Sequence, residues 1–214
     1  MRLEWIGHAC FKLTLESGVK VFTDPYDESV GIAMIPLKAD VITMSHEHHD
    51  HNEESQIIGE PVILHGDMPL SLGGLSIAAH ASYHDEVQGA KRGANHIRVF
   101  ECEGLKVVHM GDQGCMPEEE ILAAIAGADV LLLPVGGTYT LNAKEAKAVI
   151  ERIHPKCVVP MHVKTARCPY PIDPVGVFLD EMDCMGLELI AALELSAGNV
   201  PSGVVLMKPM ADEL

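Results

Sequence analysis

The stretch Ser45-His46-Glu47-His48-His49-Asp50-His51 decides more about this chain than any other, because it gathers several potential metal ligands into a few residues. Imidazole suits zinc and other first-row metals, and carboxylate suits harder ions. An isolated histidine in a strand is usually structural or on the surface. The density of ligands here instead predicts a metal site, with Glu47 and His49 pointing away. The predicted ligands in this stretch are His46, His48, Asp50 and His51.

The residues before this cluster predict its geometry. Residues 41–44 form a short apolar run with a β-branched bias, which indicates a strand that ends where the cluster begins. Side chains two residues apart in an extended chain face the same way, so His46 and His48 are expected to converge. Asp50 and His51 lie beyond the strand, where the chain turns. They can aim at a neighbouring point about 3.5 to 4 Å away, the usual separation in two-metal sites.

Further motifs occur along the chain in a fixed order. They are Trp5-Ile6-Gly7-His8-Ala9, Thr23-Asp24-Pro25, Ser82-Tyr83-His84, His109-Met110-Gly111-Asp112, Val135-Gly136-Gly137-Thr138 and Pro160-Met161-His162. Together with His-x-His-x-Asp-His after a strand, this series resembles the metallo-β-lactamase superfamily. The opening strand is similar to that of the branch containing bacterial ascorbate-6-phosphate lactonase and the N-acylphosphatidylethanolamine phospholipase D enzymes. The resemblance covers residues 1–165 and is specific for fold and metal, but not for substrate.

The resemblance implies a fold and a set of ligands. The fold is α+β, a metallo-β-lactamase-like four-layer αββα sandwich of two mixed sheets flanked by helices, formed by residues 1–214 as a single domain. Two cations are implied, each with three to four protein ligands and an open position for water, as in catalytic sites. The first would be held by His46, His48 and His84, the second by Asp50, His51 and His162, and Asp112 would bridge both.

The implied activity is hydrolysis by a hydroxide held at this binuclear centre. Two divalent ions, in the first instance zinc with manganese and iron as alternatives, lower the pKa of a shared water toward about 7. Asp50 and Asp112 are the expected catalytic residues, because they would orient the hydroxide as well as bind metal. The expected substrate is a small molecule with an ester, lactone or amide-type bond.

Three alternatives stay open at this stage. The first is a phosphodiesterase of the same fold, because the resembling branch includes a phospholipase. The second is a metal-dependent binding or sensing protein without turnover, which the intact ligand positions argue against. The third is a di-iron redox protein; redox members of the superfamily typically carry Glu at the position of His48, which favours hydrolysis.

Several other residues are weaker candidates. His8 and His109 could orient ligands, or could each merely satisfy a buried backbone partner. Cys115 could approach the metals but is expected to be a small buried side chain, and Tyr139 could line the pocket or pack as an ordinary aromatic. The basic residues nearest the motifs, able to bind an anionic group or simply solvated, are Lys91, Arg92, Lys164 and Arg167. Four histidines match no motif and are not expected to be ligands: His65, His80, His96 and His154.

Composition limits the remaining classes of function. The chain has 214 residues, of which 48% are hydrophobic and 21% charged, so a folded core is expected rather than disorder. The net charge of −16 works against binding to nucleic acid. No apolar run approaches the roughly 20 residues of a membrane span, and the first residues lack the apolar core of a signal peptide. We therefore expect a cytoplasmic protein without membrane partners; the sequence leaves room for a homo-oligomer.

The six cysteines contain no Cys-x-x-Cys pair and are expected to be reduced. Strands are predicted over residues 3–15 with an interruption near Gly7, and over 19–23, 41–44, 62–65, 75–79, 96–102, 105–109, 130–134, 157–160, 188–192 and 204–207. Glu103-Gly104 predicts a hairpin turn. Helices are predicted over residues 52–58, capped by Asn52, and over 117–126, 143–153 and 175–185. The motifs all fall at strand ends.

Overall fold

Short strands dominate the chain, and most of them assemble into two large mixed sheets. The structure is a computed structural model that describes residues 1–210. The order of the first sheet is β15 (Leu193–Glu194), β1 (Arg2–Gly7), β2 (Cys10–Thr14), β3 (Lys20–Thr23), β5 (Val41–Thr43) and β7 (Val62–Leu64). Its first four strands are antiparallel, whereas β3, β5 and β7 run parallel.

The second sheet repeats this change from antiparallel to parallel pairing. Its order is β16 (Gly203–Val204), β13 (Cys157–Met161), β12 (Val130–Pro134), β11 (Leu105–His109), β10 (Ala94–Cys102), β9 (Leu75–Tyr83) and β8 (Leu70–Leu72). Strands β8 to β11 are antiparallel, and β11, β12, β13 and β16 are parallel. Two small pairs lie outside the large sheets: β4 (Leu37–Lys38) with β6 (Ile57–Ile58), and β14 (Leu189–Ile190) with β17 (Leu206–Met207).

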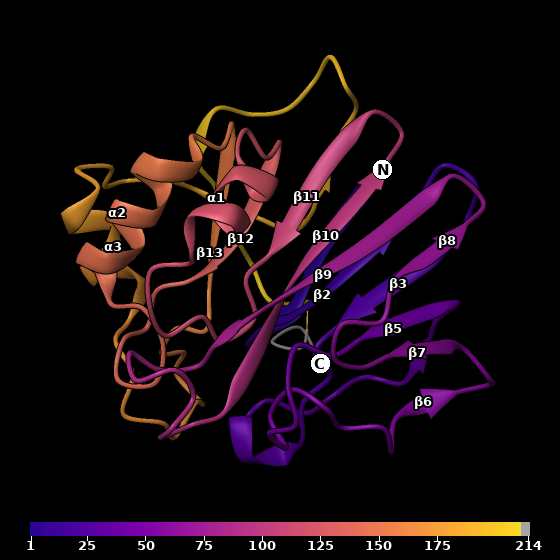
Figure 1. The fold of residues 1–214 in the computed structure, drawn as a ribbon, viewed down its shortest axis with the longest axis horizontal. Coiled ribbons are helices and arrows are strands. Elements are labelled where there is room, and N and C mark those ends of the chain that lie inside the picture. The colour runs from indigo at the N-terminus through magenta and orange to yellow at the C-terminus, as the bar shows by residue number, and fades with distance from the viewer. Residues whose placement is uncertain (211–214) are drawn as a thin grey trace.

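The core lies between the two sheets, because side chains alternate along each strand. In β1, Leu3 and Trp5 join the large apolar cluster that includes Val107 of the second sheet, whereas Ile6 faces the opposite way into a smaller cluster. That smaller cluster is covered by loop residues and by the short 3-10 helix Glu28–Val30. Each fully buried aliphatic side chain contributes about 1.5–3 kcal/mol. Figure 1 shows the long strands β9 to β11 lying across the indigo strands of the first sheet.

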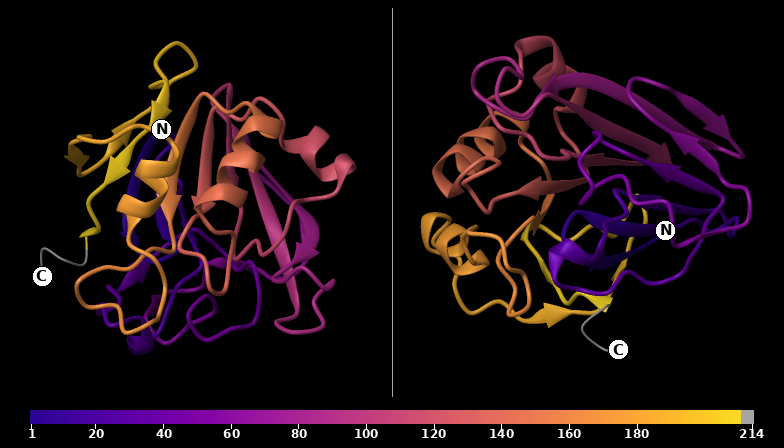
Figure 2. Two further views of the ribbon diagram at one scale, coloured as in Figure 1. Left: turned by 90° about the vertical axis from the view of Figure 1, so that its left-hand side faces the viewer. Right: turned by 90° about the horizontal axis from the view of Figure 1, so that it is seen from below.

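Three α-helices gather at the side of the molecule where β12 and β13 lie (Figure 1). They are α1 (Glu119–Ile125), α2 (Ala143–Ile153) and α3 (Val175–Glu181). The prediction for α2 is confirmed at both ends, and a capping box between Asn142 and Glu145 begins the helix. The other two are shorter than predicted. Both views in Figure 2 show α2 and α3 side by side, in agreement with their direct contact.

The predicted helix over residues 52–58 is wrong. Ile57 and Ile58 form strand β6, and the side chain of Asn52 donates to the carbonyl of Glu47 (3.1 Å) instead of capping a helix. The segment has two adjacent isoleucines at its end and no apolar stripe at helical spacing, and an isolated helix this short is unstable. The predicted hairpin at Glu103-Gly104 is confirmed, since both residues adopt positive φ between β10 and β11. Within residues 1–210, none of the helices combines the length and apolar character needed to cross a bilayer.

Candidate metal centre

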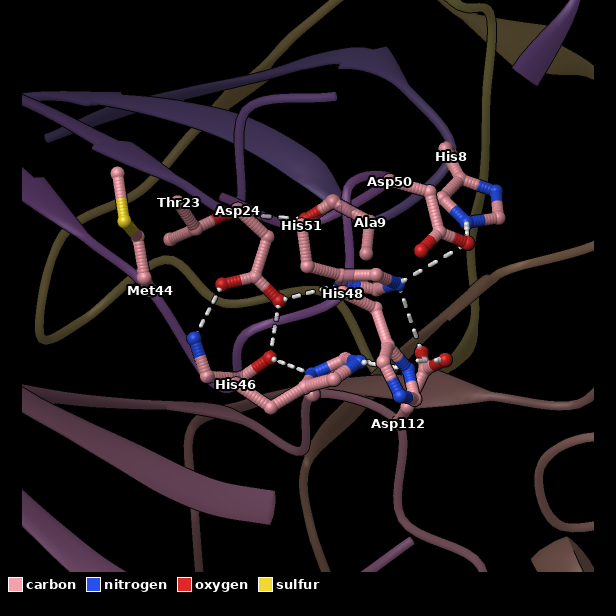
Figure 3. Close-up of polar contacts among 12 residues, drawn as sticks. His8, Ala9, Thr23, Asp24, Met44, His46, His48, Asp50, His51 and Asp112 are labelled. Atoms are coloured by element: carbon pink, nitrogen blue, oxygen red, sulfur yellow. Dashed lines mark hydrogen bonds and ion pairs between the residues drawn. The ribbon is translucent and has the colours of Figure 1, made fainter. Parts of the chain in front are cut away.

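The carboxyl ends of strands from both sheets converge on one cluster of polar side chains. Asp24 follows β3 and His46 lies just beyond β5 in the first sheet, while Asp112 and His162 follow β11 and β13 in the second. Parallel strands end at the same edge of a sheet, so the parallel halves of the two sheets deliver these residues to one place. Figure 3 shows the resulting group, in which His8, His51 and Asp50 approach Asp112 and Asp24.

The predicted first ligand group comes together in the structure. One potential ligand atom from each of His46, His48 and His84 lies within 4.8 Å of the others. The Nε2 atom of His46 is 3.1 Å from Nδ1 of His48. His46 and His84 are buried, whereas His48 is exposed. The group therefore has one side that faces solvent.

The predicted second group also comes together, with one addition. Ligand atoms of Asp50, His51 and His162 lie within 4.8 Å of one another, and His8 belongs to the same group. The Nε2 atom of His51 is 3.8 Å from Oδ2 of Asp50. His8, His51 and His162 are all buried, so this group is the interior side of the cluster.

Asp112 lies between the two groups, as expected of a bridging carboxylate. Its Oδ2 atom is 3.1 Å from Nε2 of His84 and 3.3 Å from Nε2 of His162. Its Oδ1 atom is 3.2 Å from Nε2 of His51. His46 is more distant, with 4.0 Å between its Nε2 and Oδ2 of Asp112. One buried carboxylate thus contacts histidines from both groups.

Asp24 fixes the orientation of two of these histidines. The Nδ1 atom of His51 donates to Oδ2 of Asp24 at 2.8 Å. The hydroxyl of Ser45 donates to the same oxygen (2.6 Å) and accepts from Nδ1 of His46 (2.8 Å). With their Nδ1 atoms bonded to these outer partners, His46 and His51 turn their Nε2 atoms toward the cluster. Carboxylate-oriented histidines of this kind are typical of metal ligands.

Two further contacts complete this arrangement. The Nδ1 atom of His84 donates to the carbonyl of Tyr139 at 3.1 Å, which again leaves Nε2 facing Asp112. The Nε2 atom of His109 donates to the carbonyl of Ala9 (2.8 Å), and its Nδ1 accepts from the amide of Gly111 (3.1 Å). His109 therefore joins the first strand to the turn that carries Asp112, and it is a positioning residue rather than a member of either ligand group.

The turn before Asp112 requires a glycine. Gly111 has a φ of +56°, and a Cβ there would lie 2.3 Å from the side-chain oxygen of Asn95 and 2.6 Å from Cβ of Ser45. Asn95 in turn accepts a hydrogen bond from the amide of Asp112 at 3.0 Å. The close approach of Ser45 and Gly111 brings the loops that carry His46 and Asp112 into contact.

The protonation states of the cluster fit a cation site. Burial, reinforced by the nearby His51, lowers the pKa of His46 to about 2, so its imidazole is neutral and able to bind metal. Burial alone would raise the pKa of Asp112, but His162 and His51 hold it well below the usual range. Burial also opposes charge on His51, yet Asp112 and Asp24 raise its pKa well above the ordinary value. A bound cation would take over the role of this proton.

A cavity of about 340 Å³ opens onto the cluster and is lined by residues of both groups, among them His48, Asp50, His84 and His162. Of the four basic residues singled out in the sequence, only Arg92 lines it within residues 1–210. The Nη2 atom of Arg92 donates to the carbonyl of Thr138 (3.1 Å), and its guanidinium lies 5.6 Å from the centre of the Tyr139 ring. Lys91 pairs with Glu86, Lys164 donates to the carbonyl of Tyr170 (2.6 Å), and Arg167 is exposed away from the cavity.

The other candidates lie outside the ligand groups. Cys115 is half-buried, with its Sγ 3.6 Å from Nε2 of Gln113. His96 bonds the carbonyl of Ser45, and His49 lies at the rim of the cavity, 3.3 Å from Asp27. Glu47 is exposed, as predicted. His65, His80 and His154 are not in any group of potential ligand atoms among the described residues.

Sequence reasoning missed three residues that shape the site. Tyr170 lines the cavity and bonds Ser29 (2.6 Å). Asn95 holds the Asp112 turn. Arg98 is fully buried in β10 and donates to the carbonyls of Met44 (2.9 Å) and Leu64 (3.0 Å), so it ties the ends of β5 and β7 to the second sheet. An arginine inside an apolar strand was the one available signal, since a buried charge needs dedicated partners.

Comparison with known proteins agrees with this geometry. A family model described as a β-lactamase superfamily domain matches residues 2–162. A UPF0173 metal-dependent hydrolase of Methanoregula boonei is 30% identical over 188 residues, which cover 77% of this chain and 83% of the relative. A crystal structure from Thermotoga maritima is described as that of a candidate zinc-dependent hydrolase of the metallo-β-lactamase superfamily. It matches this chain with a TM-score of 0.78 and 35% sequence identity, and the match covers 96% of this chain and 97% of that one. An isothiocyanate hydrolase from Delia radicum gut bacteria shares the fold at 15% identity (TM-score 0.68, covering 92% of this chain and 100% of that one).

The chain therefore belongs to the metallo-β-lactamase superfamily and is a metal-dependent hydrolase of that class. The predicted superfamily and its α+β sandwich of two mixed sheets are confirmed. In this member, the described layer over the outer face of the first sheet includes loops, the 3-10 helix at residues 28–30 and the strand pair β4–β6.

Proposed function

We propose that this hydrolase holds two divalent cations, in the first instance zinc, and cleaves an ester, lactone or amide-type bond of a small molecule. One observation carries the proposal. Two groups of ligand atoms meet at a single buried carboxylate, Asp112, on the floor of a cavity large enough for a small molecule. The first group is His46, His48 and His84, and the second contains Asp50, His51 and His162.

The donor set fits such cations. Bound there, the cations would supply a Lewis acid for the substrate oxygen and would lower the pKa of a water toward about 7. His46, His51 and His84 are each held by a hydrogen bond at Nδ1, so that Nε2 is directed toward the centre. Asp50 and Asp112 bring negative charge to the cavity and offer oxygens that accept hydrogen bonds from the attacking water. They are the proposed catalytic residues for that reason.

The cavity wall favours a substrate with an anionic group. Arg92 lines the cavity, and contacts with the carbonyl of Thr138 and the ring of Tyr139 orient its guanidinium group. Guanidinium matches the geometry of carboxylate and phosphate. Tyr139 and Tyr170 meet edge to face at 6.3 Å and add an apolar wall. A small ester or lactone that carries an acidic group would meet both features.

Arg92 equally favours a second candidate, a phosphodiesterase that acts on small substrates. The net charge of −16 disfavours a polyanionic nucleic acid but does not oppose a small phosphodiester at a cationic centre. The two candidate functions differ in the bond that is cleaved. Hydrolysis rates measured on a lactone and on a phosphodiester therefore decide between them.

The test combines metal content with paired rates. Protein purified without chelator is expected to contain about two zinc ions per chain and to hydrolyse dihydrocoumarin faster than bis(p-nitrophenyl) phosphate. Both rates should vanish on full metal removal and return with added zinc. Preference for the phosphodiester would select the second candidate. Turnover without metal, or bound iron with oxygen consumption, would contradict hydrolysis at a binuclear zinc centre.

We also propose a cytoplasmic location, which the reduced cysteines support. All six cysteines are free thiols in the structure. Burial raises the pKa of Cys157 to about 12 and that of Cys102 to about 11, so both behave as inert apolar side chains.

A further inference from the structure

His8 is a buried histidine that the ligand pattern of the superfamily does not use. It follows strand β1 and is 2% exposed. Among the described residues, neither of its ring nitrogens has a hydrogen-bond partner. A buried polar side chain without a hydrogen-bond partner is costly and calls for an explanation, of which a bound ion is one. Figure 3 shows its ring turned toward Asp50.

The backbone around His8 holds the ring in this place. His8 has a φ of +51°, which is unfavourable for a side chain with a Cβ. Its carbonyl accepts from the indole of Trp5 (3.0 Å) and from the amide of His162 (3.2 Å). The preceding Gly7 also has positive φ, and a Cβ there would lie 2.7 Å from the hydroxyl of Tyr26. The strained turn is therefore fixed from several sides, and it directs the ring inward.

The distances around His8 match a coordination sphere better than a hydrogen bond. Its Nε2 atom is 3.4 Å from Oδ2 of Asp50, beyond the 2.7–3.2 Å typical of an N–H···O bond. Zinc bonds of about 2.0–2.1 Å to nitrogen and oxygen would place neighbouring ligand atoms of a five-coordinate site roughly 2.9–3.6 Å apart, at angles of about 90–120°. Ligand atoms of His8, Asp50, His51 and His162 all lie within 4.8 Å of one another.

We infer that His8 is a fourth protein ligand of the second cation, alongside Asp50, His51 and His162. The inference rests on the proposed binuclear centre. It gives the two cations different numbers of protein ligands. The second cation has four protein ligands besides Asp112, and most of them are buried. The first has three histidines, one of them exposed. The second cation is accordingly the more tightly bound, and the first has more room for substrate and water.

The competing role for His8 is a positioning residue that donates a hydrogen bond to Asp50. A direct measurement separates the two, because only a ligand shares a bond with the metal. The protein is loaded with two equivalents of NMR-active cadmium and labelled at its histidine nitrogens. The inference predicts a cadmium–nitrogen coupling on Nε2 of His8. A resolved His8 resonance without coupling, while the other histidines are coupled, would overturn it.

The resonance is assigned with His8→Asn, because asparagine tolerates positive φ. The matched control is His154→Asn, which makes the same change at a φ of +53° on the exposed end of α2. With a ligand lost, the affinity for the second cation should fall by more than the 10- to 100-fold typical of an outer hydrogen-bonding partner, and the control should bind both cations normally.

The outcomes also separate this inference from the proposed function. Two bound cadmium ions with an uncoupled His8 would contradict the role of His8 alone. Binding of no more than one cation by the wild-type protein would contradict the binuclear centre and the inference together. A His8→Asn variant that does not fold leaves the coupling in the wild-type protein as the deciding result, because His8 is then assigned through its contacts with Tyr26 and His162.

Discussion

The two halves of the metal centre differ in how deeply they are built into the protein. In the first half, His48 is exposed and lines the cavity, where its ring contacts those of His46 and His84. In the second half, His51 is fully buried between Asp24 and Asp112. The comparison teaches that the two halves of the proposed centre have different tasks, because a cation in the first half would face the substrate and one in the second would be anchored in the core.

The two halves are not independent of each other, because Asp24 supports a histidine in each of them. It accepts directly from His51 and, through the hydroxyl of Ser45, orients His46. It lies at the end of β3, next to the parallel strand β5 that carries the histidine cluster. The halves are therefore unequal in exposure but share one support in the first sheet.

The largest expected difference is between His51→Ala and His48→Ala. Removing His51 takes one partner from each of two buried carboxylates, Asp24 and Asp112, and breaking a buried ion pair costs about 3–5 kcal/mol in comparable cases. We expect this variant to lose the second cation and much of its stability. His48→Ala should lose the first cation and turnover, yet unfold at nearly the wild-type urea concentration. Elemental analysis measures the loss of metal, and urea titration measures the loss of stability. Equal loss of stability in the two variants would contradict the claim that the second half is built more deeply into the fold.

A smaller effect is expected from Asp24→Asn, which keeps the shape of the side chain but weakens its hold on His46 and His51. Affinity for both cations should fall by about 10- to 100-fold, as is usual for partners behind metal ligands. Competition with a chromophoric chelator provides the measurement. Asp129→Asn is the control, because Asp129 is also buried and accepts from the amide of Lys106 (2.8 Å), but away from the centre. Weakening of one cation alone would show that Asp24 does not join the halves.

The smallest effect is expected at Asp85, in the loop that follows His84. Its carboxylate accepts from the amides of Val87, Gly89 and Arg92. Although burial opposes its charge, these backbone bonds lower the pKa of Asp85 from 3.8 to about 2. The stabilisation is therefore complete above pH 3.8 and is lost as the pH falls toward 2.

Asp85→Asn should accordingly lower the urea midpoint at neutral pH, and its difference from the wild type should shrink below pH 3.8. Urea titrations of both proteins across this range test the direction. Cation binding by the second half should stay unchanged, because the loop belongs to the first. A difference that grows as the pH falls would show that Asp85 does not act through its charge.

Much of the fold followed from local pattern. The helix over residues 143–153 and the strand over 130–134 were predicted to the residue, because the first has an apolar stripe at helical spacing and the second is a short unbroken apolar run. The two-residue strands were missed or placed inaccurately, and residues 52–58 were mistaken for a helix. Pairing across the sheets decides these short segments, and no local period records it. Strands β15 and β4 have no stability apart from the strands they meet.

The sequence by itself determined that potential metal ligands are concentrated in one place, because ligand type and close spacing are local properties of His46 to His51. It also indicated which distant motifs to join to them. Only the tertiary structure decided which side chains support the ligands and that His8, already a candidate from the sequence, lies inside a ligand group. Asn95 and Tyr170 come from segments far apart in the chain, and sheet register and burial bring them to the site, whereas a strained turn positions His8. Those are properties of the packed chain, and no short stretch of residues encodes them.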